Sequence, residues 1–471
     1  MILKHKDIEI PADEPFKNCK LKRQNQAVAL TSIISGYADG FVLSLNNPWG
    51  TGKTTFVKMW RAHLEKNGFT TLYFNAWEND YDSNPMVALM SELGALTNEK
   101  VDATFNSLIQ KAAVLSHSVL PVLLKALVAK HVDSEVLKEL LSNAGQGASD
   151  LLKEEITDYT KKKKGLVEFK IELEKFIREQ ANGKPLVIFI DELDRCRPNY
   201  AVEVLEQVKH FFSVTGIVFV LSIDKTQLGN AIRGFYGSEL INSNEYLKRF
   251  IDLEFTLPEP STGVFIEYLF EYFGFDEYFN HPERKQYPSL AHDRRDFISF
   301  SKLLFANNGL TLRQQEKLFS HARVVIRTLP RGHYLFPPVF ILLIYLKDFN
   351  PELYRKLSAR SVPVQSILDE LVAMVPKNTT EENQYTYIIM EATLMLLYHN
   401  YYKEINYNSK IYEQDSQYNT KLLIKPHTDT GPDYRKFIAI VDDLKRGRSG
   451  GDVSLNIFLK KIDLLDQLQE N

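Results

Sequence analysis

The sequence predicts an α/β fold with a parallel sheet of five strands, a helical insertion and an all-helical C-terminal region. Short apolar runs alternate with helical patterns over the first 260 residues, an order typical of a parallel sheet covered on both faces. Beyond about residue 260, apolar residues recur at helical spacing. The runs predicted to be strands are residues 41–47, 69–77, 185–194, 216–224 and 249–258.

The helices are predicted from apolar spacing and from residues that end helices. Residues 24–37 place apolar side chains at helical spacing, and residues 53–68 form a helix that ends at Gly68. Residues 85–180 have helical patterns throughout, with faces rich in Lys and Glu. The segments AVEVLEQVKHFF and KTQLGNAIRGFYG predict helices after the third and fourth strands. Such crossover helices join parallel strands.

The chain is predicted to contain five segments, because the third strand begins only after a long helical stretch. The segments are 1–99 for the first part of the sheet domain, 100–180 for a helical insertion, 181–260 for the second part of the sheet domain, 261–350 for a helical lid and 351–471 for a C-terminal helical domain.

Composition places the chain among ordinary globular proteins. Of 471 residues, 44% are hydrophobic and 25% charged, and the net charge of −3 gives no sign of a general attraction to nucleic acid. Cys19 and Cys196 are the only cysteines, which excludes a disulfide framework and favours a reducing compartment such as the cytoplasm. The N-terminal residues lack an apolar signal core, and the 11 histidines form no paired metal-ligand motif.

The segment after the first strand, NPWGTGKTT, has the residues of a phosphate-binding loop. A phosphate group needs backbone N–H groups, a helix N-terminus and a cation. Gly50 and Gly52 allow close approach of the backbone, and Lys53 supplies the charge. The hydroxyl of Thr54 can ligate Mg²⁺. The predicted nucleotide-binding residues are Asn47, Pro48, Trp49, Gly50, Thr51, Gly52, Lys53, Thr54 and Thr55.

One position departs from the pattern G-x-x-x-x-G-K-[ST], because Asn47 stands where the first glycine belongs. Asparagine is the residue that best replaces glycine at positive φ. Pro48 restricts Asn47 to extended conformations, which suits a chain that leaves a strand. The substitution is therefore expected to be mild.

The third strand ends in a second motif, the acidic segment IDELDRC. Asp191 stands where a strand-end carboxylate holds Mg²⁺ through water, and Glu192 is the candidate general base for an attacking water. Asp194 and Arg195 either order the metal site or an adjacent subunit, or form a surface ion pair. Cys196 is expected to be a packed small residue.

These motifs resemble those of the KAP family of P-loop NTPases. The segments NPWGTGKTT, FNAWEND, IDELDRCRP and YLKRFIDLEFTLP occur in the order found in that family, over roughly residues 20 to 330. The resemblance implies an ASCE/AAA+-like P-loop core. It also implies a role in bacterial defence against phage, since the family takes part of its name from a phage-exclusion protein. Only Asn47 breaks the family pattern.

The resemblance suggests further catalytic residues. Asp224 stands where related ATPases keep a polar sensor of the γ-phosphate, and its alternative role is to cap the next helix. Arg249 lies just before the fifth strand. It is either an arginine finger, which contacts the nucleotide bound to a neighbouring molecule, or a solvated side chain. Arg313 opens a helix of the predicted lid, and Arg323 and Arg327 are its rivals for contact with the γ-phosphate.

Two residues of FNAWEND each have two alternative roles. Trp77 is expected to be a packing anchor behind the site rather than a residue that stacks on a base. Glu78 either contacts the attacking water or is a solvated carboxylate.

Several apolar or basic segments could suggest a membrane or nucleic acid. Residues 112–129 contain Lys125 and polar residues, and one span there would separate Lys53 from Asp191, so a helical insertion in a protein without transmembrane segments is expected. Residues 334–346 and 385–402 are expected to be buried helices. Lys161 to Lys164 are expected to be a solvated helix end, with contact to nucleic acid or phospholipid as the alternative.

The function expected from these features is Mg-dependent binding and hydrolysis of ATP, with ATP and Mg²⁺ as cofactors. The partner is expected to be a further copy of the chain or an effector protein. Two alternatives remain: a nucleotide-gated scaffold that hydrolyses little or no ATP, and a motor stimulated by nucleic acid, which has only weak support in the basic segments.

Overall fold

The fold is described from a computed structural model. It describes residues 8–37, 39–82, 84–97, 102–116, 146–180, 183–210, 212–259, 261–374, 381–414, 420–427, 431–446 and 453–467. The chain divides into two compact units, an α/β unit over Lys6–Glu259 and a helical unit over Pro260–Asn471. The partition predicted at residues 100, 181 and 351 stays a prediction.

The α/β unit is built on a five-stranded parallel sheet with the order β2-β3-β4-β1-β5. This confirms the predicted parallel sheet of five strands. The strands are β1 (Phe41–Asn46), β2 (Thr71–Asn75), β3 (Leu186–Asp191), β4 (Ile217–Ile223) and β5 (Leu253–Phe255). β5 is shorter than the predicted 249–258, because it pairs with β1 only over residues 253–255.

Apolar side chains cover both faces of the sheet, as expected for strands that read as continuous hydrophobic runs. Every residue of β3 and β4 is buried. One hydrophobic cluster joins the sheet to α4, α5, α8 and α9, and another joins it to α1 and α2. The helices of this unit are α1 (Gln24–Gly36), α2 (Lys53–Lys66), α3 (Ala76–Asn79), α4 (Pro85–Gly94), α5 (Asp102–Ser116), α8 (Gln146–Gln180), α9 (Pro198–His210), α10 (Lys225–Tyr236) and α11 (Ser243–Leu247).

The register of the strands brings their carboxyl ends to one edge of the sheet. Asp191, the last residue of β3, lies opposite Asn75 on one side and Ser222 on the other. Asn46, the last residue of β1, lies opposite Ile223 of β4. The loops that follow β1, β2, β3 and β4 therefore meet at this edge, where ligands of open α/β sheets bind.

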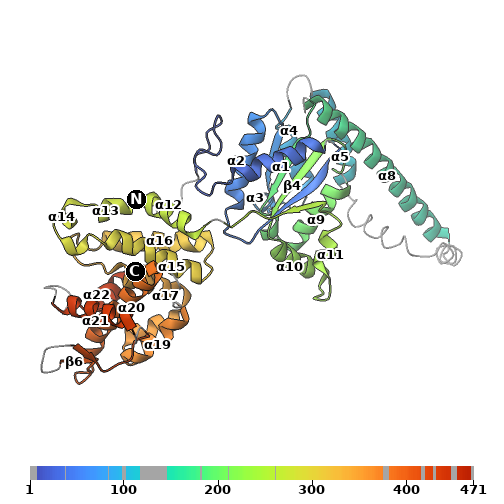
Figure 1. Ribbon diagram of the computed structural model, residues 1–471. Helices are drawn as coiled ribbons and strands as arrows, with labels where there is room; N and C mark the ends of the chain where they lie inside the picture. The colour runs from blue at the N-terminus through green and yellow to red at the C-terminus, as the bar shows by residue number, and fades with distance from the viewer. Residues whose placement is uncertain are drawn as a thin grey trace. The chain divides into compact units, whose positions relative to one another are not determined.

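The predicted insertion is described in part. α8 is a long helix that extends away from the sheet (Figure 1). α5 packs along it, and Lys111 Nζ of α5 lies 2.5 Å from Glu168 Oε2 of α8. The apolar run 112–129 lies mostly outside the described residues. Among the helices that are described, none is long and apolar enough to cross a membrane.

The all-helical prediction for the C-terminal region is wrong for β6 (Tyr412–Gln414) and β7 (Thr420–Leu422), which form a two-stranded antiparallel sheet. The run predicted at 334–346 forms α17 (Pro337–Phe349), and residues 337–346 are all buried, as expected. The remaining helices are α12 (Thr262–Tyr272), α13 (Phe275–Phe279), α14 (Pro282–Lys285), α15 (Asp293–Asn307), α16 (Leu312–Arg327), α18 (Pro351–Ala359), α19 (Val364–Met374), α20 (Glu381–Lys403), α21 (Gly431–Arg446) and α22 (Asn456–Gln467).

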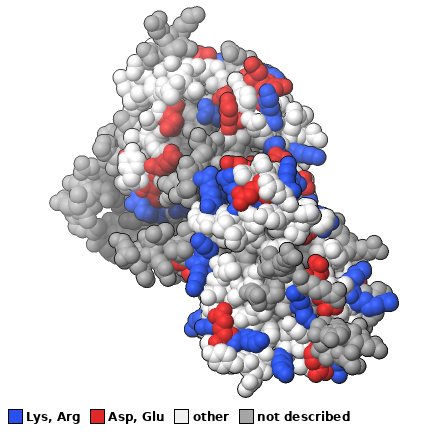
Figure 2. All heavy atoms as spheres, turned by 90° about the vertical axis from the view of Figure 1, so that its left-hand side faces the viewer, with Lys and Arg blue, Asp and Glu red and all other residues white. Residues whose placement is uncertain are grey.

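Charged side chains of both signs are interspersed on the face drawn in Figure 2. Ion pairs also join exposed side chains of the helical unit, such as Arg294 with Asp276 and Lys302 with Glu267. The charges visible on this face are thus arranged differently from the continuous basic surfaces that bind a nucleic acid backbone.

Candidate functional site

The segment between β1 and α2 has the backbone of a phosphate-binding loop. Gly50 and Gly52 have φ of 78° and 80°, values that residues with a Cβ rarely adopt. Gly52 is the residue before the first turn of α2, so the free N–H groups of this helix end point into the loop. A helix N-terminus preceded by a glycine-rich turn favours a bound anion.

Lys53 is a buried cation, with 8% of the residue exposed. Its ammonium donates hydrogen bonds to the carbonyl oxygens of Asn47 and, at 3.2 Å, Pro48. Burial lowers the pKa of Lys53, and the charges of Asp194, Asp224 and Asp191 act against this. Because its hydrogen bonds go to neutral carbonyls, the buried ammonium is suited to an incoming anion.

Asn47 is held by side-chain hydrogen bonds rather than by unusual backbone geometry. It is absent from the non-glycine residues with positive φ, so the idea that it replaces a glycine at positive φ is wrong. Its Nδ2 donates to the Leu257 carbonyl at 2.9 Å, and its Oδ1 accepts from the Leu257 N–H at 2.8 Å. Asn47 therefore joins the start of the phosphate loop to the segment that follows β5.

Replacing Asn47 by glycine would restore the consensus motif and is nevertheless expected to destabilise the protein. The N–H and C=O of Leu257 would lose their partners at a position where Leu257 is 1% exposed. An unsatisfied buried polar group costs about 1–3 kcal/mol. Urea unfolding should therefore show Asn47→Gly to be less stable than wild type. Equal or greater stability would contradict the role assigned to this side chain.

Asp191 lies at the end of β3 and is 1% exposed. Its Oδ2 accepts a hydrogen bond from the Tyr73 hydroxyl at 3.0 Å, and its Oδ1 accepts one from the Glu192 N–H at 3.0 Å. Burial and the neighbouring Asp191 charge raise the pKa of Tyr73, which keeps the hydroxyl protonated as a donor. Sequence analysis missed Tyr73; its place in the strand neighbouring the acidic motif was the only available signal.

Glu192 has left-handed backbone geometry, with φ 60° and ψ 23°, immediately after the strand. Residues other than glycine adopt this conformation rarely, and such positions are often found at functional sites. Its carboxylate forms an ion pair with Arg195, with Nη1 and Oε1 2.7 Å apart. Burial raises the pKa of Glu192, while Arg195 and a hydrogen bond from Asn75 lower it.

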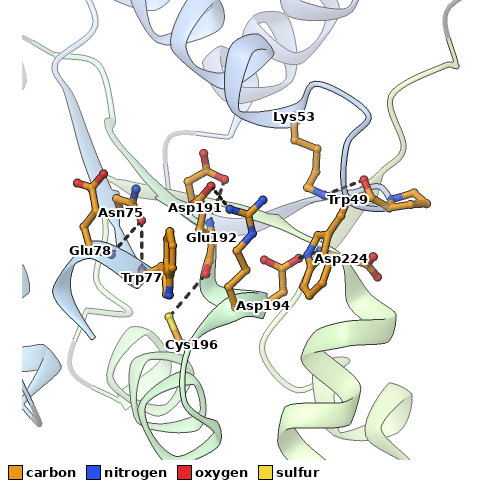
Figure 3. A network of polar contacts seen from close by, with 12 residues as sticks. Trp49, Lys53, Asn75, Trp77, Glu78, Asp191, Glu192, Asp194, Cys196 and Asp224 are labelled. Carbon is orange, nitrogen blue, oxygen red and sulfur yellow. Dashed lines mark hydrogen bonds and ion pairs between the residues drawn. The ribbon is translucent and has the colours of Figure 1, made fainter. Parts of the chain in front are cut away.

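Asp194 is buried and connects two loops of the site (Figure 3). One of its carboxylate oxygens accepts hydrogen bonds from Trp49 Nε1 at 2.7 Å and from the Asp224 N–H at 2.6 Å. A surface ion pair between Asp194 and Arg195, one of the two expectations, is therefore wrong. Asp224 caps α10 by accepting hydrogen bonds from Thr226 and Gln227 N–H. Contact between Asp224 and a phosphate stays a prediction.

Trp77 is 55% exposed, so the expectation of a buried packing anchor is wrong. It is the second residue of the short helix α3, whose cap, Asn75, accepts hydrogen bonds from the backbone N–H groups of Trp77 and Glu78. The ring lies beside the guanidinium of Arg195. Glu78 is exposed, which agrees with a solvated carboxylate. Cys196 is buried as expected, and burial raises the pKa of its thiol.

The two remaining arginines lie in different units. Arg249 is exposed, two residues after α11 and shortly before β5. Arg313 is exposed near the start of α16, in the helical unit, while its rival Arg323 forms an ion pair with Glu277. Contact of Arg249 or Arg313 with a nucleotide stays a prediction.

The residues at this edge fit a magnesium–nucleotide ligand. Lys53 and the glycine-rich turn would supply the cation and the N–H groups, and Asp191 and Thr54 would supply oxygen atoms for Mg²⁺. Within the described part of the chain, no cluster of three or more His, Cys, Asp or Glu side chains could hold a metal ion. Mg²⁺ would accordingly need oxygens from the ligand and from water, as is usual for this ion.

Comparison of the chain with models of known protein families identifies its family. The model of the KAP family P-loop domain matches residues 23–332, which is more than half of the chain. The chain belongs to the KAP family of P-loop NTPases. The resemblance seen in the phosphate loop and the acidic motif is thereby confirmed. The KAP domain match begins at Arg23 and extends past α16, and it supports nucleotide binding at this site.

Other comparisons add less about this KAP domain. Over 177 residues the chain is 31% identical to an uncharacterized protein of Methanocaldococcus jannaschii, an alignment that covers 33% of this chain and 90% of that protein. Among solved structures, the ORC2 protein of Aeropyrum pernix, determined as ADPNP–ADP complexes, aligns over 95% of this chain and 94% of its own. The sequence identity is 14% and the TM-score 0.30, so the fold assignment rests on the sheet and the family.

Proposed function

We propose that this KAP protein binds and hydrolyses ATP in the presence of Mg²⁺ and uses the reaction as a conformational switch. The observation that carries the proposal is the buried Lys53 ammonium, which donates to loop carbonyls and lies in the field of Asp191, Asp194 and Asp224. A fixed cation, a glycine-rich helix end and a strand-end carboxylate together suit a triphosphate with its metal.

In this mechanism each group of the site has one task. The N–H groups of the loop and Lys53 bind the phosphates. Thr54 and Asp191 would hold Mg²⁺, which neutralises phosphate charge when bound. The Glu192 carboxylate accepts the proton of the attacking water as general base. Tyr73 keeps the Asp191 carboxylate oriented through its hydrogen bond.

The proposal also assigns roles to two arginines that lie outside the phosphate loop. Arg249 would reach the nucleotide of a neighbouring copy, and Arg313 would approach the γ-phosphate from the helical unit. A triphosphate contacted by both units would favour one arrangement of them, and its hydrolysis would remove that preference. A role in bacterial defence against phage is also proposed, on the resemblance to the family alone.

Replacing Glu192 by glutamine tests the proposal, because it removes the base while keeping the shape of the side chain. We expect phosphate release to fall at least about 100-fold, within the range that general bases contribute. Affinity for ATP should remain within about threefold of wild type, since glutamine removes no phosphate ligand. Phosphate release and binding of a fluorescent ATP analogue are measured on the full-length protein.

The other candidate functions give different results in the same assay. Wild-type protein that binds ATP and releases no phosphate would reject hydrolysis and favour a nucleotide-gated scaffold. Stimulation of turnover by added DNA or RNA would favour a motor that acts on nucleic acid. Unchanged turnover in Glu192→Gln would reject Glu192 as the base.

A further inference from the structure

Arg195 lies between two exposed tryptophans beside the acidic motif. Its guanidinium carbon is 5.8 Å from the centroid of the Trp49 ring and 5.9 Å from that of Trp77, distances at which a cation and an aromatic ring attract each other. Trp49 belongs to the phosphate loop and Trp77 to the short helix α3 after β2. Arg195 thus connects two loops that are distant in sequence.

The same guanidinium contacts the candidate base. Arg195 Nη1 donates to Glu192 Oε1 at 2.7 Å, and 26% and 15% of the two side chains are exposed. The backbone of Glu192 is fixed separately, because its N–H donates to Asp191 and its C=O accepts from the Arg195 N–H at 3.1 Å. The backbone contacts leave the Glu192 side chain free to rotate, and the ion pair with Arg195 restrains its carboxylate.

We propose that Arg195 is a positioning residue that holds the Glu192 carboxylate in its reactive orientation, and that Trp49 and Trp77 hold Arg195 in place. This inference rests on the proposed hydrolysis of ATP. The arginine acts through Glu192 and needs no contact of its own with the nucleotide.

The two tryptophans are held in different ways. The Trp49 ring is fixed by a hydrogen bond, because its Nε1 donates to Asp194 at 2.7 Å. At Trp77 the backbone is fixed, because its backbone N–H donates to the Asn75 side chain at 3.1 Å. Figure 3 shows both rings beside the acidic motif. A long arginine side chain loses rotamer entropy when it is fixed, and the flanking rings reduce that cost by limiting its rotamers beforehand.

The arrangement also links the phosphate loop to the base. Trp49 directly follows Pro48, whose carbonyl accepts a hydrogen bond from Lys53. A movement of the loop around bound phosphates would move Trp49, and with it the support of Arg195. The geometry of Glu192 would then depend on the state of the loop.

Replacing Arg195 by alanine separates positioning from binding. Phosphate release by the full-length protein is expected to fall about 10- to 100-fold, the size of effect that a displaced catalytic group produces. KM and the affinity for ATP should stay within about twofold, because no phosphate ligand is lost. Arg195→Lys should recover part of the rate, since it keeps the charge and loses the planar geometry.

A matched control is available two residues along the chain. Arg197 is exposed and pairs with Asp80, with Nε and Oδ1 2.8 Å apart. Within the described residues, no hydrogen bond, ion pair or cation–π contact joins it to Glu192 or to a tryptophan. Arg197→Ala should keep the wild-type rate. The intrinsic tryptophan fluorescence should change in Arg195→Ala and stay constant in Arg197→Ala, because Trp49 and Trp77 flank Arg195 and not Arg197.

Combination with Glu192→Gln decides whether Arg195 acts through the base. In single-turnover measurements, adding Arg195→Ala to Glu192→Gln should cause no further loss of rate. A loss equal to that in the wild-type background, or a parallel loss of ATP affinity, would overturn the proposal. A wild-type rate in Arg195→Ala would also overturn it while leaving the proposed function intact. A wild-type protein without turnover would reject both.

Discussion

Replacing Lys53 by alanine is expected to weaken the binding of ATP by at least about 100-fold. The ammonium is buried and its hydrogen bonds go to the carbonyls of Asn47 and Pro48, so a bound phosphate gains a charge-assisted contact in a site shielded from water. Hydrogen bonds to charged groups contribute about 1.5–3 kcal/mol each, and about 2.7 kcal/mol corresponds to 100-fold in affinity.

The measurement is titration of the full-length protein with ATP and Mg²⁺ in a calorimeter. Lys66 provides a control on the same helix, because it lies at the far end of α2 and donates to the Asp13 carbonyl at 2.6 Å. Lys66→Ala should bind ATP as wild type does. If Lys53→Ala also retained affinity within threefold, the nucleotide would have to bind elsewhere, and the mechanism built on this loop would fail.

The parts of the site that a sequence can predict are those whose residues are contiguous. Gly50, Gly52 and Lys53 stand within one turn between a strand and a helix, and local geometry alone brings them to one ligand. Asp191 was predictable for a related reason, because the carboxyl ends of parallel strands meet at one edge of the sheet.

Contacts between distant residues could not be predicted in this way. The bonds of Asn47 to Leu257 join residues 210 positions apart, and they give the asparagine in the loop a structural role. The bond of Trp49 to Asp194 spans 145 positions. The β6–β7 hairpin was missed for another reason: its paired strands are only three residues long each, too short for a period of two to be recognised.

The second large effect is expected in the helical unit, where Arg284 and Asp293 form a buried ion pair. The Arg284 side chain is 1% exposed, and its Nη1 donates to the Tyr278 hydroxyl at 3.0 Å and to the Arg331 carbonyl at 2.9 Å. Replacing Arg284 by methionine fills much of its volume and leaves the Asp293 carboxylate buried without its cation. Breaking a buried pair in this way costs about 3–5 kcal/mol.

Chemical unfolding of the full-length protein, followed by circular dichroism, measures this loss. Arg294 is the control, because it lies one residue from Asp293 and pairs with Asp276 at 2.9 Å while both side chains are more than 40% exposed. Exposed pairs contribute about 0–1 kcal/mol, so Arg294→Ala should change stability little.

A second change distinguishes the lost charge balance from lost packing. Adding Asp293→Asn to Arg284→Met removes the unpaired carboxylate, so the double variant should be more stable than Arg284→Met alone. If packing and the hydrogen bonds to Tyr278 and Arg331 dominated, the second change would add its own loss instead. The sign of this difference therefore shows whether Arg284 stabilises the helical unit mainly by neutralising Asp293 or by joining α14 to the segment after α16.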